Sequence, residues 1–450
     1  MKKLGLLVMP LLAISFLVGC NHKSTYHFKF IGDHCTLNGK TTYEENIGVD
    51  KTEIKYTITP DEGYQLDYLD DSIPRSVTLE DNVLTIAKMD QDYIVNVNAI
   101  DNDIATIMLV SFEPETSIAN QYDVVFRCGE NDSIKEVDWG DGIKDTLQMH
   151  NYASAGEYLI TIRGELTSFR LALPTKLNKC FNAVKIYSKI TSLFNSAFCD
   201  CHNLISLHFP KCVNSIGNGA FQNCSSLTYI DMPYHLDSFG EHNSGEMMFC
   251  GCSKLQSIII PGDATTIGSK CFWGCASLTS ISIPNSVTSI CDGAFVDCFS
   301  LTSISIPNGV TSIGVCAFEG CFSLPSIIIP DSVTSISSDT FRNCASLTSI
   351  NIPTNPSLIS IPDDFCNGCI SLPSIAITNN IKRIGPTAFK DCFNLSVVDL
   401  SIVDHLIELD GDSVFAGHAD VFQIRVRESL KSEYMTASNW SKYADYIVGV

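Results

Sequence analysis

The chain has 450 residues, of which 45% are hydrophobic and 18% are charged, and 50 acidic against 29 basic side chains give a formal net charge of −21. This apolar content is typical of a folded chain and excludes an intrinsically disordered one. The acidity argues against nucleic acid and anionic membrane surfaces as partners, because both repel a negatively charged protein.

The first twenty residues predict export. Two lysines at the start precede an apolar stretch over residues 4–17, which is too short to span a bilayer comfortably. The stretch ends in Leu-Val-Gly-Cys20, which resembles the lipobox of bacterial lipoproteins, where cleavage before the cysteine leaves it to be acylated. We therefore expect a signal peptide at residues 1–20, lipidation of Cys20, and an exported lipoprotein at the outer membrane or cell surface. An ordinary signal peptide with a chance cysteine is the alternative.

Residues 21–102 are expected to form a small all-β domain. Polar and apolar residues alternate over residues 55–59 and 93–98, as they do in half-buried strands. The turn Pro60-Asp-Glu-Gly-Tyr64 is similar to that of divergent internalin-type B repeats, which are β-modules used as spacers.

Residues 103–165 contain the motif Val-Asp138-Trp139-Gly-Asp141-Gly, followed by His-Asn-Tyr152. The glycines supply a tight hairpin turn and Trp139 fills a core. The motif resembles the PKD-type immunoglobulin-like β-sandwich. Asp138 and Asp141 allow two interpretations, a Ca²⁺ site or side chains that bond their own turn, and we favour the turn.

From about residue 180 the sequence repeats every 23 residues, most clearly in Cys275-Ala-Ser-Leu-Thr-Ser-Ile-Ser-Ile-Pro-Asn-Ser-Val-Thr-Ser-Ile290. An Ala-Phe pair and the next Cys complete each unit. Near Cys366 the register slips and this cysteine takes the Phe place, while the last copy has His418 in the Cys place. The repeated phenylalanines are Phe198, Phe221, Phe249, Phe272, Phe295, Phe318, Phe341, Phe389 and Phe415.

One unit cannot fold alone. Burying five or six apolar side chains at about 1.5 to 3 kcal/mol each does not offset the ordering of the whole unit at about 1 to 2 kcal/mol per residue. Neighbouring units must therefore stack into a solenoid of about ten coils with a parallel sheet on one side. Within a unit, Leu278, Ile281 and Ile283 form a short strand with one buried face, and Pro284 ends it.

The pattern Cys-x-x-Leu-x-x-Ile-x-Ile-Pro-x-x-Val-Thr-x-Ile-Gly-x-x-Ala-Phe-x-x-Cys closely resembles the BspA-type (Treponema-type) leucine-rich repeat over about residues 180–425. The resemblance implies a curved β-solenoid and adhesion of the cell surface to host matrix proteins or other bacteria. We expect a mainly β protein in which two small all-β domains precede a leucine-rich-repeat solenoid at residues 166–427. Residues 428–450, with a short helix and Trp440, are expected to cap the last coil.

Most of the twenty cysteines belong to the repeat. Nine of them hold one position in successive coils and are expected to stack as a column of reduced, buried packing residues, because parallel side chains rarely offer disulfide geometry. The spacing does not suit a metal site. Disulfides remain possible among five others, Cys199, Cys250, Cys271, Cys291 and Cys316.

The candidate working surface consists of the residues that face outward from the strands. They form a hydroxyl-lined, nearly uncharged strip that suits a broad protein contact or a glycan. The alternative is that they are merely soluble strand residues. Tyr229, His208 and the insertion at residues 241–245 are the favoured anchors, and the candidate ligand-binding residues are His208, Tyr229, Asp231, Ile259, Ser282, Ser305, Ile328 and Asn351.

No catalytic, metal-binding or phosphate-binding motif stands out, so we expect neither an enzyme nor a cofactor. The expected function is that of a monomeric adhesin that recognises a host matrix protein or another cell through the solenoid face. The alternative is a lipoprotein that captures carbohydrate. The membrane is expected to be contacted only through the lipid, and nucleic acid is not an expected partner.

Overall fold

The computed structural model divides the chain into two compact units, Met1–Asn102 and Asp103–Val450. The residues that the structure describes are 25–33, 35–40, 42–48, 54–60, 64–66, 77–80, 83–86, 93–101, 104–112, 122–129, 132–154, 156–171, 181–186, 190–208, 213–230, 232–233, 236 and 246–450.

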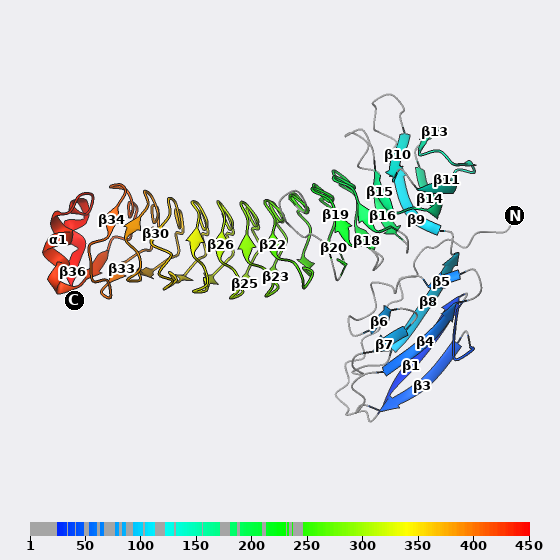
Figure 1. Cartoon of the computed structure of the whole chain (residues 1–450), viewed down its shortest axis with the longest axis horizontal. Coiled ribbons are helices and arrows are strands. Elements are labelled where there is room, and N and C mark those ends of the chain that lie inside the picture. The colour runs from blue at the N-terminus through cyan, green and yellow to red at the C-terminus, as the bar shows by residue number, and fades with distance from the viewer. Residues whose placement is uncertain are drawn as a thin grey trace. The chain divides into compact units, whose positions relative to one another are not determined.

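The first unit is built from strands. One sheet has the order β3-β1-β8-β5 and the other the order β2-β4-β7-β6 (Figure 1). The alternation predicted at residues 55–59 and 93–98 falls within β4 and β8. The strands are β1 (Thr25–Asp33), β2 (Cys35–Leu37), β3 (Thr42–Gly48), β4 (Ile54–Pro60), β5 (Tyr64–Leu66), β6 (Val77–Glu80), β7 (Val83–Ile86) and β8 (Tyr93–Asp101).

The second unit begins with two layers of strands around Trp139. Its side chain is fully buried, and the Tyr152 hydroxyl donates a hydrogen bond of 2.8 Å to the Trp139 carbonyl. Trp139 fills this core as the sequence predicts, while the likeness to a PKD domain stays a prediction. The strands are β9 (Ile104–Phe112), β10 (Tyr122–Cys128), β11 (Ser133–Asp138), β12 (Lys144–Asp145), β13 (Met149–Tyr152), β14 (Gly156–Glu165) and β15 (Ser168–Leu171).

Both layers continue directly into the solenoid. Strand β15 pairs antiparallel with β10 and parallel with β17 (Ser192–Leu193), which pairs with β19 (Ser215–Ile216). In the other layer β9 pairs with β16 (Phe181–Ile186), which pairs parallel with β18 (Ser206–His208). One hydrophobic core therefore runs from the two-layered region into the coils.

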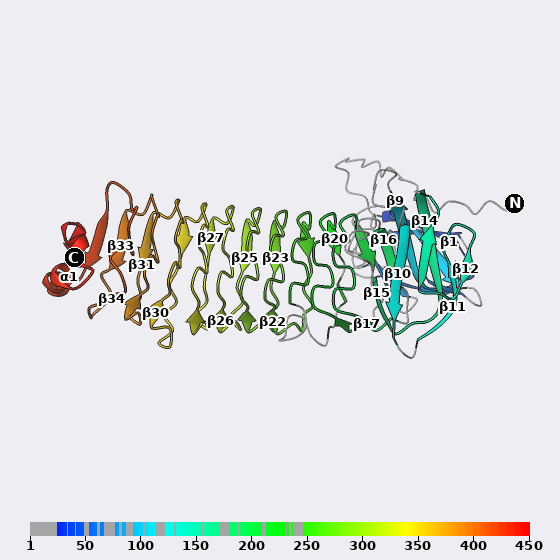
Figure 2. The ribbon, with the colours of Figure 1, turned by 90° about the horizontal axis from the view of Figure 1, so that it is seen from above.

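The solenoid has about eleven turns, and most of its described coils contribute two short strands that pair with the equivalent strands of neighbouring coils (Figures 1 and 2). The first-strand series is β18, β20 (Tyr229–Ile230), β21 (Ser257–Ile258), β23 (Ser280–Ser282), β25 (Ser303–Ser305), β27 (Ser326–Ile327), β29 (Ser349–Ile350), β31 (Ser374–Ala376), β33 (Val397–Leu400) and β35 (Gln423–Val426). The second-strand series is β17, β19, β22 (Thr266–Ile267), β24 (Ser289–Ile290), β26 (Ser312–Ile313), β28 (Ser335–Ile336), β30 (Ser360–Ile361), β32 (Arg383–Ile384) and β34 (Glu408–Leu409).

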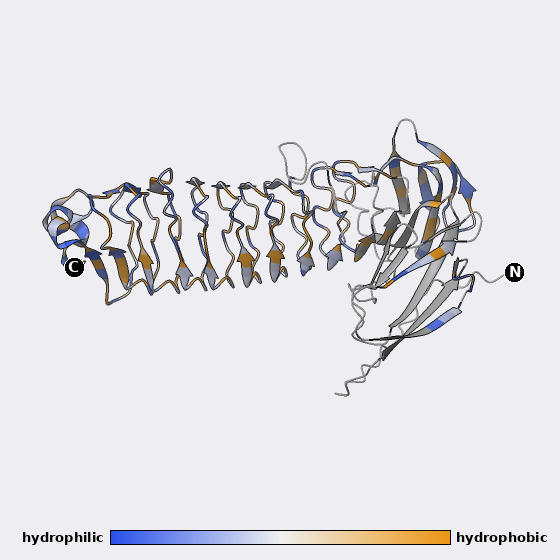
Figure 3. Ribbon diagram, turned by 60° about the horizontal axis from the view of Figure 1, so that its bottom comes forward, coloured by the Kyte–Doolittle hydropathy of each residue, from blue (hydrophilic) through white to orange (hydrophobic). Residues whose placement is uncertain are grey.

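The repeat sets the register of the coils. Ser280 pairs with Ser303 in the first series, and Ser289 pairs with Ser312 in the second. The mainly β, leucine-rich-repeat solenoid predicted from the sequence is confirmed. The second row of strands goes beyond the single sheet expected, because the Val-Thr-Ser-Ile segment also meets its copy in the next coil. Polar and apolar residues alternate along the coils (Figure 3).

Phenylalanine and cysteine form two of the side-chain rows in the core of the solenoid. The rings of Phe272 and Phe295 are 5.4 Å apart and 9° from parallel, and similar stacks run from Phe198 to Phe341. The cysteine column consists of Cys201, Cys224, Cys252, Cys275, Cys298, Cys321, Cys344, Cys369 and Cys392, all fully buried.

The column thiols also bond the backbone of the neighbouring coil. The Cys298 thiol donates to the Phe272 carbonyl over 3.3 Å, and the same bond recurs from Cys224 to Cys392. A thiol is small enough for this row and supplies a donor for a carbonyl that water cannot reach. The column therefore packs as predicted and fastens each coil to the one before it.

The residue before each column cysteine has a left-handed backbone. Glycine tolerates this conformation, and Asn and Asp adopt it more readily than other residues. The residues of this row are Asp200, Asn223, Gly251, Gly274, Asp297, Gly320, Asn343, Gly368 and Asp391, and Gly417 precedes His418 at the equivalent place. The chain can therefore reverse at the same point in every coil.

The register slip predicted near residue 366 is confirmed. The Cys366 amide bonds the Ala388 carbonyl, as the amide of Phe295 bonds Ala317 in a regular coil. The ring enters the stack from the preceding position instead, because Phe365 occupies the position that Ala294 and Ala317 hold in regular coils. The Phe365 ring accordingly meets its neighbours Phe341 and Phe389 edge-on, at 89° and 79°.

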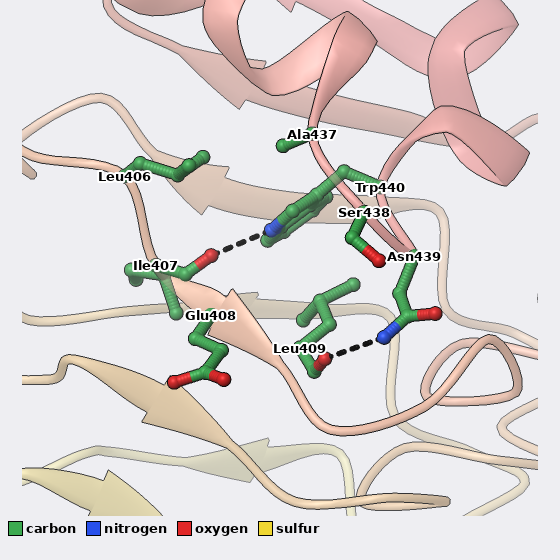
Figure 4. Close-up of a pocket in the computed structure, with 8 residues that line it drawn as sticks. All are labelled: Leu406, Ile407, Glu408, Leu409, Ala437, Ser438, Asn439 and Trp440. Atoms are coloured by element: carbon green, nitrogen blue, oxygen red, sulfur yellow. Dashed lines mark hydrogen bonds between the residues drawn. The ribbon is translucent and has the colours of Figure 1, made fainter.

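The C-terminal segment covers the last coil. It consists of η2 (Glu428–Leu430), α1 (Lys431–Thr436), η3 (Ser441–Tyr446) and β36 (Ile447–Gly449), and β36 pairs parallel with β35. The Trp440 indole N–H donates to the Ile407 carbonyl, and the Asn439 amide donates to the Leu409 carbonyl (Figure 4). Side chains thus satisfy backbone groups of β34 that a further coil would have satisfied.

Candidate binding surface

The strand face is the row of outward-facing side chains of the first-strand series. In β23 the two serines are exposed while Ile281 between them points inward and is only 7% exposed. The same alternation continues in β25, β27, β29 and β31, and Ser282 pairs with Ser305 in register. The outward orientation predicted for Ser282, Ser305, Ile328 and Asn351 agrees with the structure.

Two isoleucines interrupt this otherwise polar row. Ile259 is 52% exposed and Ile328 is 77% exposed, although both follow a buried strand residue. Single exposed apolar side chains are normal on protein surfaces and do not by themselves mark a binding site. These residues give the strand face its two apolar points.

The strand face carries no ionisable side chain from β21 to β31. Charged residues return with Asp399 in β33 and Arg425 in β35. The outward residues in between are Ser257, Ile259, Ser280, Ser282, Ser303, Ser305, Ser326, Ile328, Ser349, Asn351, Ser374 and Ala376. A ligand of this stretch is therefore recognised by shape, hydrogen bonds and apolar contact, and not by charge.

Asn351 has a structural partner that the sequence does not reveal. Its side-chain amide nitrogen donates to the Ile329 carbonyl, and its side-chain oxygen accepts from the Ile329 amide, both at 2.8 Å. The side chain thus acts as one more peptide group in the ladder between two coils. It is less available to a ligand than its outward position suggests.

The N-terminal anchors of the predicted site are only partly described. Tyr229 lies in β20 and is half-buried. The backbone of His208 lies in β18, and its side chain is not described. Asp231, the insertion at residues 241–245 and Cys20 lie outside the described residues. Their assignment to the site or to lipidation stays a prediction.

The turn around Trp139 uses its carboxylates internally. Asp138 accepts from the Gly140 amide and pairs with Lys144 at 2.8 Å. Asp141 accepts from the Ile143 amide and pairs with His150 at 2.8 Å. Partial burial opposes it, but these hydrogen bonds lower the pKa of Asp141 below its ordinary value. The geometry is that of turn chemistry, the interpretation favoured from the sequence.

The cysteines are poorly suited to reaction chemistry. All those in the described part of the chain are free thiols, including the five outside the column for which pairing was left open. Burial raises the pKa of Cys392 to about 12 and that of the Cys298 thiol well above its ordinary value. The reactive thiolate form is therefore suppressed.

The described residues lack two features of other functional classes. Among them, no group of three or more His, Cys, Asp or Glu side chains is arranged to hold a metal ion. No helix in the same residues is long and apolar enough to cross a bilayer.

Sequence reasoning missed one exposed apolar row. In six successive coils, from Ala276 to Phe393, the residue after the column cysteine is apolar, and the phenylalanine and isoleucine members are well exposed. The available signal was this shared position. We define the turn ridge as Phe299, Phe322, Ala345, Ile370 and Phe393.

The chain belongs to the BspA-type leucine-rich-repeat family. The family model, described as the BspA type leucine rich repeat region, matches residues 176–298 and 288–422 with six copies, which together cover more than half of the chain. Leucine-rich-repeat proteins are in general non-enzymatic scaffolds that bind protein ligands, and no catalytic family is indicated.

Several solved structures with partial similarity are bacterial leucine-rich-repeat proteins. A leucine rich cell surface protein from Faecalibacterium prausnitzii is 25% identical over 60% of this chain and 83% of its own, with a TM-score of 0.34. The leucine rich repeat protein of T. pallidum is 24% identical over 48% and 83%, with a TM-score of 0.30. One from Bacteroides ovatus is 20% identical over 64% and 95%, with a TM-score of 0.28. No curated protein is significantly similar to the chain.

Proposed function

We propose that this chain is a lipid-anchored cell-surface adhesin that binds a host matrix protein or another cell through its strand face. The observation that carries the proposal is the uncharged strand face, which extends over successive coils and exposes Ile259 and Ile328. The buried centre of a protein–protein interface is depleted of charged residues, and the strand face carries none from β21 to β31. The family to which the chain belongs supports a binding role at the cell surface.

A protein ligand is favoured over a glycan by the two isoleucines. A sugar ring is recognised through hydroxyl hydrogen bonds and aromatic faces, and an isolated aliphatic side chain offers neither. The serines of the strand face are compatible with either ligand. Capture of carbohydrate is therefore the second outcome of the test.

The test measures binding of the purified protein to immobilised fibronectin, laminin and collagen and to a glycan array. Saturable binding to a matrix protein is expected, and Ile328→Ser should weaken it at least tenfold because an apolar contact is lost. Leu147→Ser is the control, since Leu147 is 61% exposed and lies between β12 and β13, outside the solenoid. Saturable binding to sugars without binding to any protein would reject adhesion.

The anchor is tested separately on cells. Incorporation of labelled palmitate is expected for the wild-type chain and not for Cys20→Ser. Protease added to intact cells should remove the solenoid from the wild-type strain. A solenoid that survives inside a sealed envelope contradicts direct contact with a host.

A further inference from the structure

The turn ridge lies outside the strand face and differs from it in chemistry. Phe299, Phe322, Ile370 and Phe393 are between 40% and 57% exposed. The Phe299 and Phe322 rings stack with centroids 5.1 Å apart and planes 6° from parallel. The stack shows that the side chains of these two coils align along the solenoid axis, and the equivalent residues of the following coils continue the row.

Backbone hydrogen bonds fix this alignment. The Ser346 amide donates to the Phe322 carbonyl, and the Asn394 amide donates to the Ile370 carbonyl, each from the next coil. The ridge is also bounded, because the same position holds His202, Ser225, Ser253 and the small Ala276 in the N-terminal coils. A row with large apolar side chains in only part of the solenoid is a local feature and not a requirement of the repeat.

The dimensions of the ridge restrict its occupant. Aromatic side chains carry about 150 to 250 Å² each, so four residues at roughly half exposure offer about 350 Å² of apolar surface. A stable dimer buries about 800 Å² on each partner. The ridge is therefore too narrow for a second copy of this chain and fits a slender segment.

The spacing of the ridge indicates which segment. A helix places a side chain on one face at each turn of about 5.4 Å, close to the ring separation of Phe299 and Phe322. A strand places side chains on one face about 6.8 Å apart and loses this match. Because the two rings cover each other's inner faces, they are also less suited to stacking with sugar rings.

We propose that the turn ridge binds an amphipathic α-helix of a protein partner, laid along the solenoid axis with its apolar face on the ridge. Four coil steps of about 4.8 Å make the ridge about 19 Å long. A helix that covers it has about 13 residues. This site is independent of the strand face proposed above, because it lies at a different position in each coil.

The probe is a fluorescein-labelled synthetic helix of 14 residues with leucines alternately three and four apart. A peptide of the same composition with the leucines dispersed serves as the comparison. We expect saturable anisotropy changes with the first peptide and binding at least tenfold weaker with the second. The purified full chain is used throughout.

Two variants locate the binding. Phe322→Ser removes a ring of the stack, and Ala345→Lys places a charge at the half-buried centre of the ridge. Each should weaken peptide binding at least tenfold while the unfolding transition stays cooperative. Ile328→Ser, on the strand face, should leave peptide binding unchanged and weaken matrix binding, so that the two proposals fail separately.

Three results would overturn the proposal. The first is no saturable binding of the amphipathic peptide, and the second is equal binding of both peptides. The third is concentration-dependent dimerisation that Phe322→Ser abolishes, because the ridge would then be occupied by a second copy of the chain.

Discussion

The two ends of the solenoid are closed in different ways. At the N-terminal end both strand series continue as backbone ladders into the two-layered region, through β15 and β16. At the C-terminal end the first series gains one more strand, β36, while the second series meets side chains of the cap. The difference teaches that an open coil needs its apolar core covered and its amides and carbonyls paired, and that backbone or side chains can do either.

The largest expected effect is at the C-terminal end. Trp440→Ala should lower the free energy of unfolding by about 3 to 5 kcal/mol, because it empties a buried site and leaves the Ile407 carbonyl unpaired. Guanidinium unfolding followed by circular dichroism measures the change. Met435→Ala, in α1 and partly exposed, is the control and should cost well under about 1 kcal/mol. Equal costs for the two variants would show that the side-chain closure contributes little.

Removal of the Asp132 carboxylate at the N-terminal end of the solenoid should lower the free energy of unfolding. Asp132 accepts hydrogen bonds from the Thr167 amide and hydroxyl and from the Gly129 amide, and so holds the segment that leads into β15. Asp132→Ala should cost about 2 kcal/mol at pH 7, since hydrogen bonds to a charged acceptor are lost. Urea unfolding measures the difference in the free energy of unfolding. Glu157→Ala is the control, because the Glu157 side chain in β14 is exposed.

The Asp132 effect should depend on pH. Burial opposes it, but the hydrogen bonds lower the pKa of Asp132 below its ordinary value of 3.8. A depressed pKa in the folded state means that the stabilisation is present above the unfolded pKa and is lost as the pH falls through the folded one. The gap between wild type and Asp132→Ala should therefore close below pH 3.8. If the difference in the free energy of unfolding between wild type and Asp132→Ala persists below this pH, the Asp132 side chain stabilises the fold by packing and not by its charge.

A variant in the middle of the solenoid tests whether the whole solenoid, with both of its closed ends, unfolds as one cooperative unit. Cys298→Ala removes a buried sulfur and its bond to the Phe272 carbonyl, and should cost about 1 to 2 kcal/mol. The whole solenoid should still unfold in one transition. Two separate transitions would mean that the closures stabilise only their own halves. Cys291→Ala, at a half-buried position outside the column, is the control.

The smallest expected effect is a gain. Cys316 has a left-handed backbone with φ of 55°, where the preceding coil has Gly293 at 63°. Cys316→Gly should raise stability by about 0.5 kcal/mol, because glycine adopts this conformation without strain but loses more entropy on folding. Thermal unfolding measures the gain, and Cys316→Ala is the control that keeps the strain. A loss with glycine would show that the side chain contributes more than the strain costs.

The interior of the solenoid could be predicted because each coil repeats the same local signal. The positions of Phe295, Cys298 and Ile281 follow from spacing alone, and so does the slip at Cys366. The Phe365 ring, which replaces the phenylalanine missing at Cys366, was not expected, since the regular copies have Ala294 and Ala317 at its position. What the repeat cannot encode is how one coil departs from the others.

The two ends and the detail of the strand face could not be predicted in the same way. Pairing of β9 with β16 joins segments distant in sequence, and no residue pattern in either strand predicts which strand it pairs with. The outward position of Asn351 followed from alternation, but its bonds to Ile329 depend on the distance between coils. The cap with Trp440 was predicted because the last coil of a solenoid must be covered, whereas the Ile407 acceptor of Trp440 depends on tertiary packing that the sequence does not specify.

The identical reversal before each column cysteine has a genetic consequence. Recombination that duplicates or deletes one 23-residue unit between Cys252 and Cys344 joins equivalent backbone conformations. The structures that close the two ends of the solenoid are therefore unchanged. The number of copies can then drift in a population while the protein still folds. Selection can thus adjust the reach of the molecule in steps of about 4.8 Å without inventing a new sequence.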